Sequence, residues 1–193
     1  MIISAKKVLE LNEKYNLIEN LSDREKNNPE GVGFDVRVGE VYKIKGSCFL
    51  GVEERKTPEI EKIADIRENN ENKFITLNKG DYVLIKTIEK VNLPGEKIEI
   101  EQNKTPRLLM IDAYPRSTLQ RCGIYFRGTK TDPGYEGELT FALANLGNCE
   151  FKLELGARFA NIVFKEVIGD LAREYQGQWN KGRVATKETE KQN

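Results

Sequence analysis

Short segments in which apolar and polar residues alternate recur along this chain, and they constrain its fold more than any other feature. Residues 34–38 alternate Phe, Val and Val with Asp and Arg, and the same two-residue period returns at 139–143 and 151–155. Because successive side chains of a strand point to opposite faces, this period predicts strands with one buried face. Turn-forming sequences such as Asn-Lys-Gly-Asp at 78–81 separate such segments. We therefore predict an all-β fold, a distorted β-barrel or jelly roll.

Other segments complete this prediction. Ser4 is a good helix cap, and loosely spaced apolar residues after it predict a short N-terminal helix over about residues 4–15. Residues 20–31 are polar and predict a loop. Helically spaced apolar residues predict a second short helix within residues 57–72, in a stretch (53–72) that we interpret as a surface insertion without a readable role. Further strands are predicted at 41–44, 47–52, 74–77, 82–88, 97–101, 108–113 and 159–167.

The absence of histidine excludes several kinds of catalytic site. The chain has no histidine at all, which rules out His-based triads, His-containing zinc sites and imidazole acids or bases. A catalytic base must therefore be Asp, Glu, Lys or Tyr. The three cysteines are far apart in the sequence, so we interpret them as small buried side chains in a reducing cytosol rather than as zinc ligands. Zinc-dependent deamination of a base is excluded with them.

Charge and length indicate a single soluble domain. Lys plus Arg and Asp plus Glu number 31 each among 193 residues, and this balance argues against a general nucleic-acid binder. No apolar run approaches the length of a membrane span, and the N-terminus lacks a signal pattern, so we expect a cytoplasmic protein with no membrane partner. Residues 1–174 are predicted to form the domain. The polar, glycine-containing residues 175–193 are predicted to form a flexible tail.

Five segments combine arginines, hydroxyls, a carboxylate on a Pro-Gly turn, and glycines. Arginines and hydroxyls can bind anions, a carboxylate can activate water, and the aromatic ring of Tyr135, three residues after Asp132, offers a stacking surface. The sequences of the five segments are Gly-Phe-Asp-Val-Arg-Val-Gly at 33–39, Pro-Arg-Ser-Thr-Leu-Gln-Arg at 115–121, Asp-Pro-Gly-Tyr-Glu-Gly-Glu-Leu at 132–139 with Asn145, Gly-Ala-Arg-Phe-Ala-Asn-Ile-Val-Phe at 156–164, and Tyr-Gln-Gly-Gln-Trp at 175–179.

Together these segments resemble the superfamily of deoxyuridine triphosphatases and deoxycytidine triphosphate deaminases. The resemblance implies a β-barrel protomer, a homotrimer with active sites at subunit boundaries, and a triphosphate substrate bound with Mg²⁺. Magnesium prefers phosphate oxygens and water, so few or no direct protein ligands are expected. The main activity that we predict from the resemblance is a hydrolase reaction of nucleotide metabolism. In it, dUTP is cleaved to dUMP and pyrophosphate.

The resemblance assigns the chemical step to Asp132 and the sugar contact to Tyr135. The matching aspartate activates a water that attacks the α-phosphorus, a task that suits a carboxylate when no imidazole is available. The matching aromatic ring packs under the deoxyribose and leaves no room for a 2′-hydroxyl. The alternative interpretations are a turn aspartate and a core tyrosine.

Phosphate binding is assigned to the segment after Pro115. Arg116 would supply paired donors to phosphate oxygens, and Ser117 a hydroxyl and a backbone N–H. Thr118 and Arg121 complete the segment as substrate-binding residues. An ordinary surface turn is the alternative interpretation.

Two further regions are expected to contact the phosphates. Arg158 and Asn161 lie in the fourth segment, where asparagine stands in place of the usual glutamine. Gly177 and Gln178 belong to the tail, which would close over the phosphates and exclude water.

The sequence indicates less clearly how the nucleobase is recognised and what the first segment, residues 33–39, does. The resemblance implies that backbone groups of a hairpin at about 124–131 hold the base, with Gly128 permitting close approach. Asp35 and Arg37 are expected either to support the site or to form a structural ion pair.

One position separates the two activities of the superfamily. Deaminating members carry a glutamate ten residues beyond the aspartate that matches Asp132, and this position is Ala142 here. Deamination without that proton carrier should be severely impaired, which is why we predict dUTP hydrolysis. Arg121 and the tail motif, however, look deaminase-like. A dCTP deaminase, alone or bifunctional, is the first alternative, and a non-catalytic nucleotide-binding regulator is the second.

Overall fold

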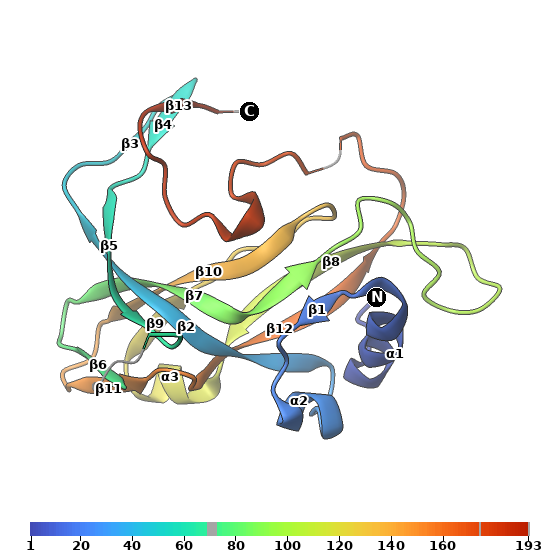
Figure 1. The fold of residues 1–193 in the computed structure, drawn as a ribbon, viewed down its shortest axis with the longest axis horizontal. Coiled ribbons are helices and arrows are strands. Elements are labelled where there is room, and N and C mark those ends of the chain that lie inside the picture. Colours follow the sequence, from blue (N-terminus) through green and yellow to red (C-terminus); the bar gives the residue numbers. More distant parts are fainter. Residues whose placement is uncertain (69–72, 174, 193) are drawn as a thin grey trace.

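One large antiparallel sheet forms the body of the protein (Figure 1). The computed structural model describes residues 1–68, 73–173 and 175–192. The strand order of the sheet is β8-β12-β2-β7-β10-β9. These strands span Gly33–Lys45 (β2), Tyr82–Asn92 (β7), Leu108–Pro115 (β8), Ile124–Arg127 (β9), Glu136–Asn145 (β10) and Arg158–Val167 (β12).

A pair of backbone hydrogen bonds nearly closes this sheet into a barrel. Its outermost strands are β8 and β9. Thr131, just beyond β9, pairs with Ile111 of β8, each residue donating its N–H to the other's carbonyl at 2.8 and 3.0 Å. Closure protects edge strands that would otherwise present unpaired backbone groups. The predicted all-β, barrel-like fold class is therefore confirmed.

Aromatic rings fill the interior of the barrel. Phe34, Val36 and Val38 of β2 are fully buried, as their alternation predicts. The rings of Phe34 and Phe164 meet edge to face with centroids 6.3 Å apart, a geometry that aromatic pairs favour. The predicted strands at 34–38, 139–143 and 159–167 are thus confirmed as parts of β2, β10 and β12.

The predicted N-terminal helix is confirmed as α1, Ala5–Tyr15. The Ser4 hydroxyl accepts a hydrogen bond from the Lys7 N–H at 3.3 Å, so Ser4 caps the helix as expected. A third helix, α3 (Ser117–Arg121), follows β8. None of the helices in the described part of the chain combines the length and apolar character needed to cross a membrane.

The prediction of a loop over residues 20–31 is wrong, because the segment contains helix α2, Asp23–Asn27. The Ser22 hydroxyl accepts a hydrogen bond from the Glu25 N–H. A serine followed three residues later by glutamate is a recognised sequence signal for a helix start, and the polar composition of the segment obscured it.

The predicted helix within residues 57–72 is also wrong. A hairpin of β3 (Phe49–Leu50) and β4 (Glu54–Lys56) leads into β5 (Glu59–Asp65). Strand β5 pairs with the far end of β2, so it extends the main sheet and is not a surface insertion. Pairing with β2 outweighs the local helical spacing, because strand formation depends on cross-strand partners. Residues 69–72 lie outside the described residues.

The shorter strands match the predictions unevenly. β6 (Phe74–Leu77) and β11 (Phe151–Glu154) pair with each other where strands were predicted, and β1 (Ile18–Glu19) pairs with β7. The strand predicted at 97–101 is wrong, since the structure has only a bridge there, from Ile98 to Arg107.

Cys48 and Cys149 are exposed, so the expectation of buried cysteines is wrong for both.

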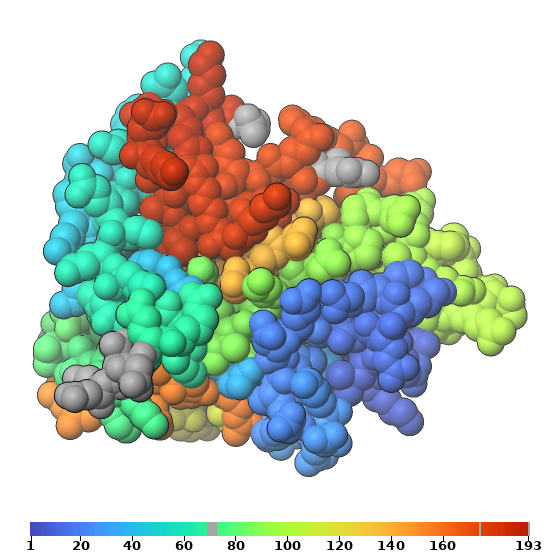
Figure 2. All heavy atoms as spheres, viewed as in Figure 1, coloured from blue at the N-terminus to red at the C-terminus, as the bar shows by residue number. Residues whose placement is uncertain are grey.

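The C-terminal segment, residues 175–192, lies across β10 and reaches the β3–β4 hairpin. Figure 2 shows its red atoms spread between the cyan hairpin and the orange strand beneath. It contains a turn of 3-10 helix, η1 (Asn180–Gly182), and β13 (Glu190–Lys191), which pairs with β4. Residue 174, where we placed the end of the domain, and residue 193 lie outside the described residues. The flexibility of this segment stays a prediction.

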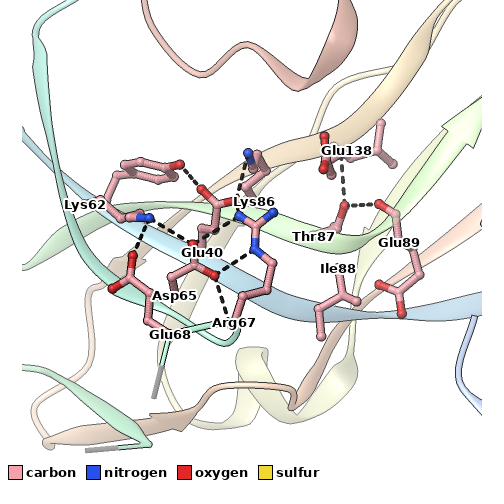
Figure 3. A network of polar contacts seen from close by, with 12 residues as sticks. Glu40, Lys62, Asp65, Arg67, Glu68, Lys86, Thr87, Ile88, Glu89 and Glu138 are labelled. Carbon is pink, nitrogen blue, oxygen red and sulfur yellow. Dashed lines mark hydrogen bonds and ion pairs between the residues drawn. The ribbon is translucent and has the colours of Figure 1, made fainter. Parts of the chain in front are cut away.

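A network of ion pairs around two buried carboxylates, Glu40 and Asp65, joins β2, β5 and β7 (Figure 3). Glu40 pairs with Lys86 at 2.9 Å and also contacts Arg67, which pairs with Asp65 at 3.0 Å. Burial alone would raise the pKa of the Glu40 and Asp65 carboxyls. Hydrogen bonds from Tyr42 and Lys86 to Glu40, and from Arg67 and Lys62 to Asp65, outweigh burial and hold both pKa values below their ordinary range.

We expect Glu40→Gln to lower the free energy of unfolding by about 3 kcal/mol at neutral pH, because the change leaves the largely buried Lys86 ammonium without its carboxylate. A depressed pKa stabilises the fold at pH values above the unfolded pKa, which is near 4.5 for Glu40, and this contribution is lost as the pH falls further. Urea unfolding should therefore show the gap between wild type and variant narrowing below about pH 5. The exposed Glu59→Gln is the control, and a gap independent of pH would contradict the prediction.

Candidate functional site

A cavity of about 670 Å³ lies between the main sheet and the C-terminal segment. Asp132, Tyr135 and Thr140 line it from β10 and the turn that precedes it. Trp179 and Arg183 line it from the C-terminal segment. We call this space the Asp132 cavity.

The barrel closure and a tight turn position Asp132 itself. Its neighbour Thr131 is fixed to β8 by the Ile111 pair. Gly134 adopts φ +91°, which a residue with a side chain rarely tolerates, and its N–H donates to the Leu93 carbonyl at 2.8 Å. The Asp132 side chain is 39% exposed and forms an ion pair with Lys130. A rigid backbone therefore presents an accessible carboxylate with a cation beside it.

Two tyrosine rings form one wall near Asp132. Tyr135 is buried, and its hydroxyl donates to the Glu138 carbonyl at 2.7 Å. The Tyr175 ring packs against it with centroids 5.8 Å apart and planes at 59°. Burial raises the pKa of both phenols, so both stay neutral near pH 7 and offer flat surfaces rather than a base. The sequence motif at residues 175–179 indicated that the tail belongs to the site, but it did not predict that Tyr175 packs against Tyr135.

Strand β10 presents a hydroxyl and a methyl group next to this wall. The Thr140 hydroxyl is buried and has no hydrogen-bond partner among the described residues. Ala142 lies two positions further along the same face, opposite Leu84 of β7 and Arg127 of β9. The position where deaminating relatives carry glutamate therefore holds a small apolar side chain among longer ones.

A second group of predicted residues forms what we call the arginine cluster. Asp35 accepts a hydrogen bond from Arg158 at 3.1 Å and from Asn161 at 3.0 Å, and it pairs with Arg116 at 3.2 Å. Asn161 lies directly opposite Asp35 where β12 pairs with β2. The structure thus brings together one carboxylate, two guanidinium groups and an amide that the sequence placed in three segments.

Helix α2 contacts the arginine cluster through the side chain of Glu25. The Glu25 side chain is 1% exposed. It accepts a hydrogen bond from the Asp35 N–H at 3.1 Å and lies 3.7 Å from the Arg158 guanidinium. Sequence reasoning missed this residue, because it predicted a loop there.

The arginine cluster and the Asp132 cavity are far apart within one protomer. Thr131 lies opposite Ile111, whereas Arg116 follows the end of β8. Arg116 lies five residue steps beyond Ile111 along the chain, which corresponds to about 17 Å of extended backbone. The predicted phosphate-binding arginines and the predicted base are therefore not brought together in the isolated chain.

The other predicted residues have varied settings. Ser117 and Thr118 begin helix α3, and Arg121 donates to the Ser117 carbonyl at 3.1 Å. Gly128 lies against Phe126, whose ring a β-carbon would approach to 2.8 Å. Their roles in binding stay predictions.

Arg37 and the tail residues show clear contacts. Arg37 pairs with Glu89 at 2.7 Å, and Glu89 is 1% exposed. Burial raises the pKa of Glu89, while the hydrogen bonds from Arg37 act in the opposite direction. Gln178 accepts a hydrogen bond from Arg55. Gly177 lines a smaller cavity beside Asp132.

Within the described residues, no three Asp, Glu or Cys side chains gather as ligands for a metal ion. Mg²⁺ is expected to bind the phosphates of a nucleotide rather than protein side chains, and this stays a prediction.

Comparison with known proteins relates the chain to enzymes that act on dCTP. A family model described as dCTP deaminase-like matches residues 2–167. A dCTP deaminase of Thermococcus gammatolerans is 32% identical over 171 residues, covering 89% of this chain and 88% of that one. One from Thermococcus kodakarensis is 29% identical over 147 residues, 76% of each chain.

A solved structure shows the same fold. The 2′-deoxycytidine 5′-triphosphate deaminase of Agrobacterium tumefaciens aligns with a TM-score of 0.59 at 16% sequence identity. The alignment covers 84% of this chain, which spans 47% of that structure's length.

These relatives correct the sequence-based function. We predicted dUTP hydrolysis as the main activity, and that prediction is contradicted because the relatives matched above are named dCTP deaminases. The prediction gave one side chain, the alanine at position 142, more weight than the tail motif and Arg121, which already looked deaminase-like. The resemblance to the superfamily as a whole is confirmed.

Proposed function

The chain belongs to the dCTP deaminase-like family, and on that premise we propose that it binds dCTP and deaminates its cytosine ring. The observation that carries the proposal is the extent of the family match. Residues 2–167 include Asp132, Tyr135, Thr140 and the whole arginine cluster, so the match covers the scaffold and the barrel side of the candidate site, whereas the C-terminal wall of the cavity lies beyond it.

The proposed substrate suits the groups that line the Asp132 cavity. The Tyr135–Tyr175 wall offers a flat apolar surface for the nucleoside. The unpartnered Thr140 hydroxyl can donate to or accept from the pyrimidine ring, which would remove the cost of leaving it unpaired. A cavity with a few polar groups on apolar walls is the usual form of a small-molecule site.

The triphosphate is proposed to bind the arginine cluster of a second protomer. Arg116 and Arg158 offer forked donors that match phosphate oxygens, and about 17 Å of strand separates Arg116 from the Asp132 region of the same chain. A closed ring of protomers with head-to-tail contacts would unite the two groups in every site. We therefore propose a homotrimer with sites at subunit boundaries, with Mg²⁺ carried on the triphosphate.

The proposed reaction uses Asp132 as the proton carrier. The oxygen of a water bonds to C4 of the ring, while Asp132 takes one proton and passes it to ring N3. The same carboxylate then moves the proton of the new C4 hydroxyl to the amino group, and the bond between C4 and the amino nitrogen breaks. One water is consumed and one ammonia is released, leaving dUTP. Among the residues that line the Asp132 cavity, Asp132 is the carboxylate able to do this.

One observation favours a second candidate, a nucleotide-binding regulator without catalysis. The methyl group of Ala142 lies where deaminating members carry their glutamate, and it cannot carry a proton. If Asp132 cannot reach the ring, the site would bind dCTP without converting it.

We expect Asp132→Asn to lower ammonia release from dCTP by about 10²- to 10⁴-fold, the usual effect of removing a general base. Ammonia would be measured with a coupled assay, and dCTP affinity by calorimetry. Asp170→Asn, at a carboxylate whose side chain is 87% exposed, is the control. Absence of ammonia from the wild type, with dCTP still bound, would reject deamination in favour of the regulator.

Ala142→Glu should raise ammonia release from dCTP, by up to about 10²-fold, because it adds a proton carrier on the face that Thr140 shares. Ala142→Gln is the matched control, since it fills the same space without an ionisable group. Circular dichroism would verify that both variants fold. Equal rates for the two variants would contradict the prediction.

Mixing two inactive variants tests the shared site. In mixed trimers of Asp132→Asn and Arg116→Ala, about a quarter of sites combine an intact Asp132 from one protomer with an intact Arg116 from its neighbour. We expect recovery of ammonia release to that extent. A mixture of Arg116→Ala with Arg158→Ala should show none, because both arginines belong to one protomer's cluster. No recovery in the first mixture would contradict a shared site.

A further inference from the structure

We infer that Arg55 is a positioning residue that, through Trp179, holds the C-terminal segment closed over the Asp132 cavity of its own protomer. The inference gives a role to the β3–β4 hairpin, which sequence reasoning left without one. Its consequence for catalysis rests on the proposed function, whereas its consequence for the C-terminal segment does not.

The central contact is made by two guanidinium groups that lie near the Trp179 ring. The guanidinium carbon of Arg55 lies 4.6 Å from the centroid of the Trp179 ring, and that of Arg183 lies 6.0 Å from it. Arg55 also donates to the side-chain carbonyl of Gln178. Tryptophan is the best of the aromatic side chains for a cation–π contact, and arginine is its more frequent partner in proteins.

Hydrogen bonds on both sides of this stack tie the segment to the hairpin. Strand β13 pairs with β4. Thr57 and Thr186 exchange hydrogen bonds, each backbone N–H donating to the other's hydroxyl at 3.1 and 2.8 Å. The Gln192 N–H donates to the Glu53 carbonyl at 2.7 Å. The hairpin is therefore a platform that binds the segment along its length.

The two guanidinium groups on Trp179 are held by different partners. Arg183 forms a forked ion pair with Glu190, with one contact at 3.1 Å, so residues within the C-terminal segment already fix it. Arg55 comes from β4, and its other side-chain partner is Gln178. Loss of the Arg55 side chain therefore removes the hairpin's contacts with Gln178 and Trp179, while the backbone pairing of β13 with β4 and the segment's internal ion pair remain.

Closure of the segment shapes the Asp132 cavity directly. Trp179, Arg183 and Val184 line that cavity together with Thr57 and Pro58 from the chain that follows the hairpin. Beneath them, Gly182 approaches β10 so closely that a β-carbon on Gly137 would lie 2.3 Å from its backbone nitrogen. The segment is thus a wall of the cavity. Displacing it would expose Asp132 and any bound nucleotide to water, which closing segments exclude in other enzymes.

The single tryptophan of the chain makes the inference measurable. Trp179 is the only tryptophan, so its fluorescence reports on this contact alone. We expect Arg55→Ala to shift its emission to longer wavelength and to raise the accessible population seen by acrylamide quenching roughly two- to tenfold, the factor that one cation–π contact supplies. Arg55→Lys should recover part of the effect. Lys56→Ala, the neighbour on the opposite face of β4, is the control.

Kinetics separate positioning from mere loss of structure. With dCTP as substrate, Arg55→Ala should raise KM more than it lowers kcat, and its far-ultraviolet circular dichroism should match that of the wild type. Should Arg55→Ala not fold, Trp179→Leu provides a second route. It should speed tryptic cleavage at the exposed Lys181 and Lys187 without cleaving the barrel.

The outcomes for the two proposals are distinguishable. Greater quenching of Trp179 in Arg55→Ala supports the positioning role even if the wild type releases no ammonia. Unchanged quenching, or unchanged tryptic cleavage in Trp179→Leu, overturns the positioning role even if dCTP is deaminated.

Discussion

The backbone pair between Ile111 and Thr131 is the constraint on which the candidate site depends. It joins the outer strand β8 to the chain just beyond the other outer strand, β9, and so turns an open sheet into a nearly closed barrel. The same pair fixes the chain immediately before Asp132, and the Pro-Gly turn then directs that carboxylate into the cavity. A loop residue is thereby held as firmly as a strand residue, which a proton carrier requires because its geometry decides its efficiency.

The arginine cluster and the Asp132 cavity differ in their distribution of charge. The arginine cluster is balanced internally by Asp35 and Glu25, so two guanidinium groups can lie partly buried without strong repulsion. The Asp132 cavity has apolar walls and few cations. In the proposed site, the triphosphate binds the first group and the pyrimidine nucleoside binds the second. The separation along β8 therefore favours an assembly in which neighbouring protomers complete each other's sites.

The error over the activity shows how a single position can mislead. Ala142 lacks the proton carrier of deaminating members, and from this we inferred hydrolysis of the triphosphate instead. The dCTP deaminase-like family model matches residues 2–167, which include the whole barrel, despite this position. Under the proposed function, position 142 bears on proton transfer at the ring, and the surrounding strands on nucleotide binding.

Local patterns in the sequence determined the barrel strands, the cap of α1 and the Asp-Pro-Gly turn, because period, capping and turn chemistry act over a few residues. Only the tertiary structure decided that Asp35 joins Arg116 and Arg158, that β5 extends the sheet, and that Arg55 meets Trp179. Those contacts link residues far apart in the chain. They follow from strand register and barrel closure, which no local pattern specifies.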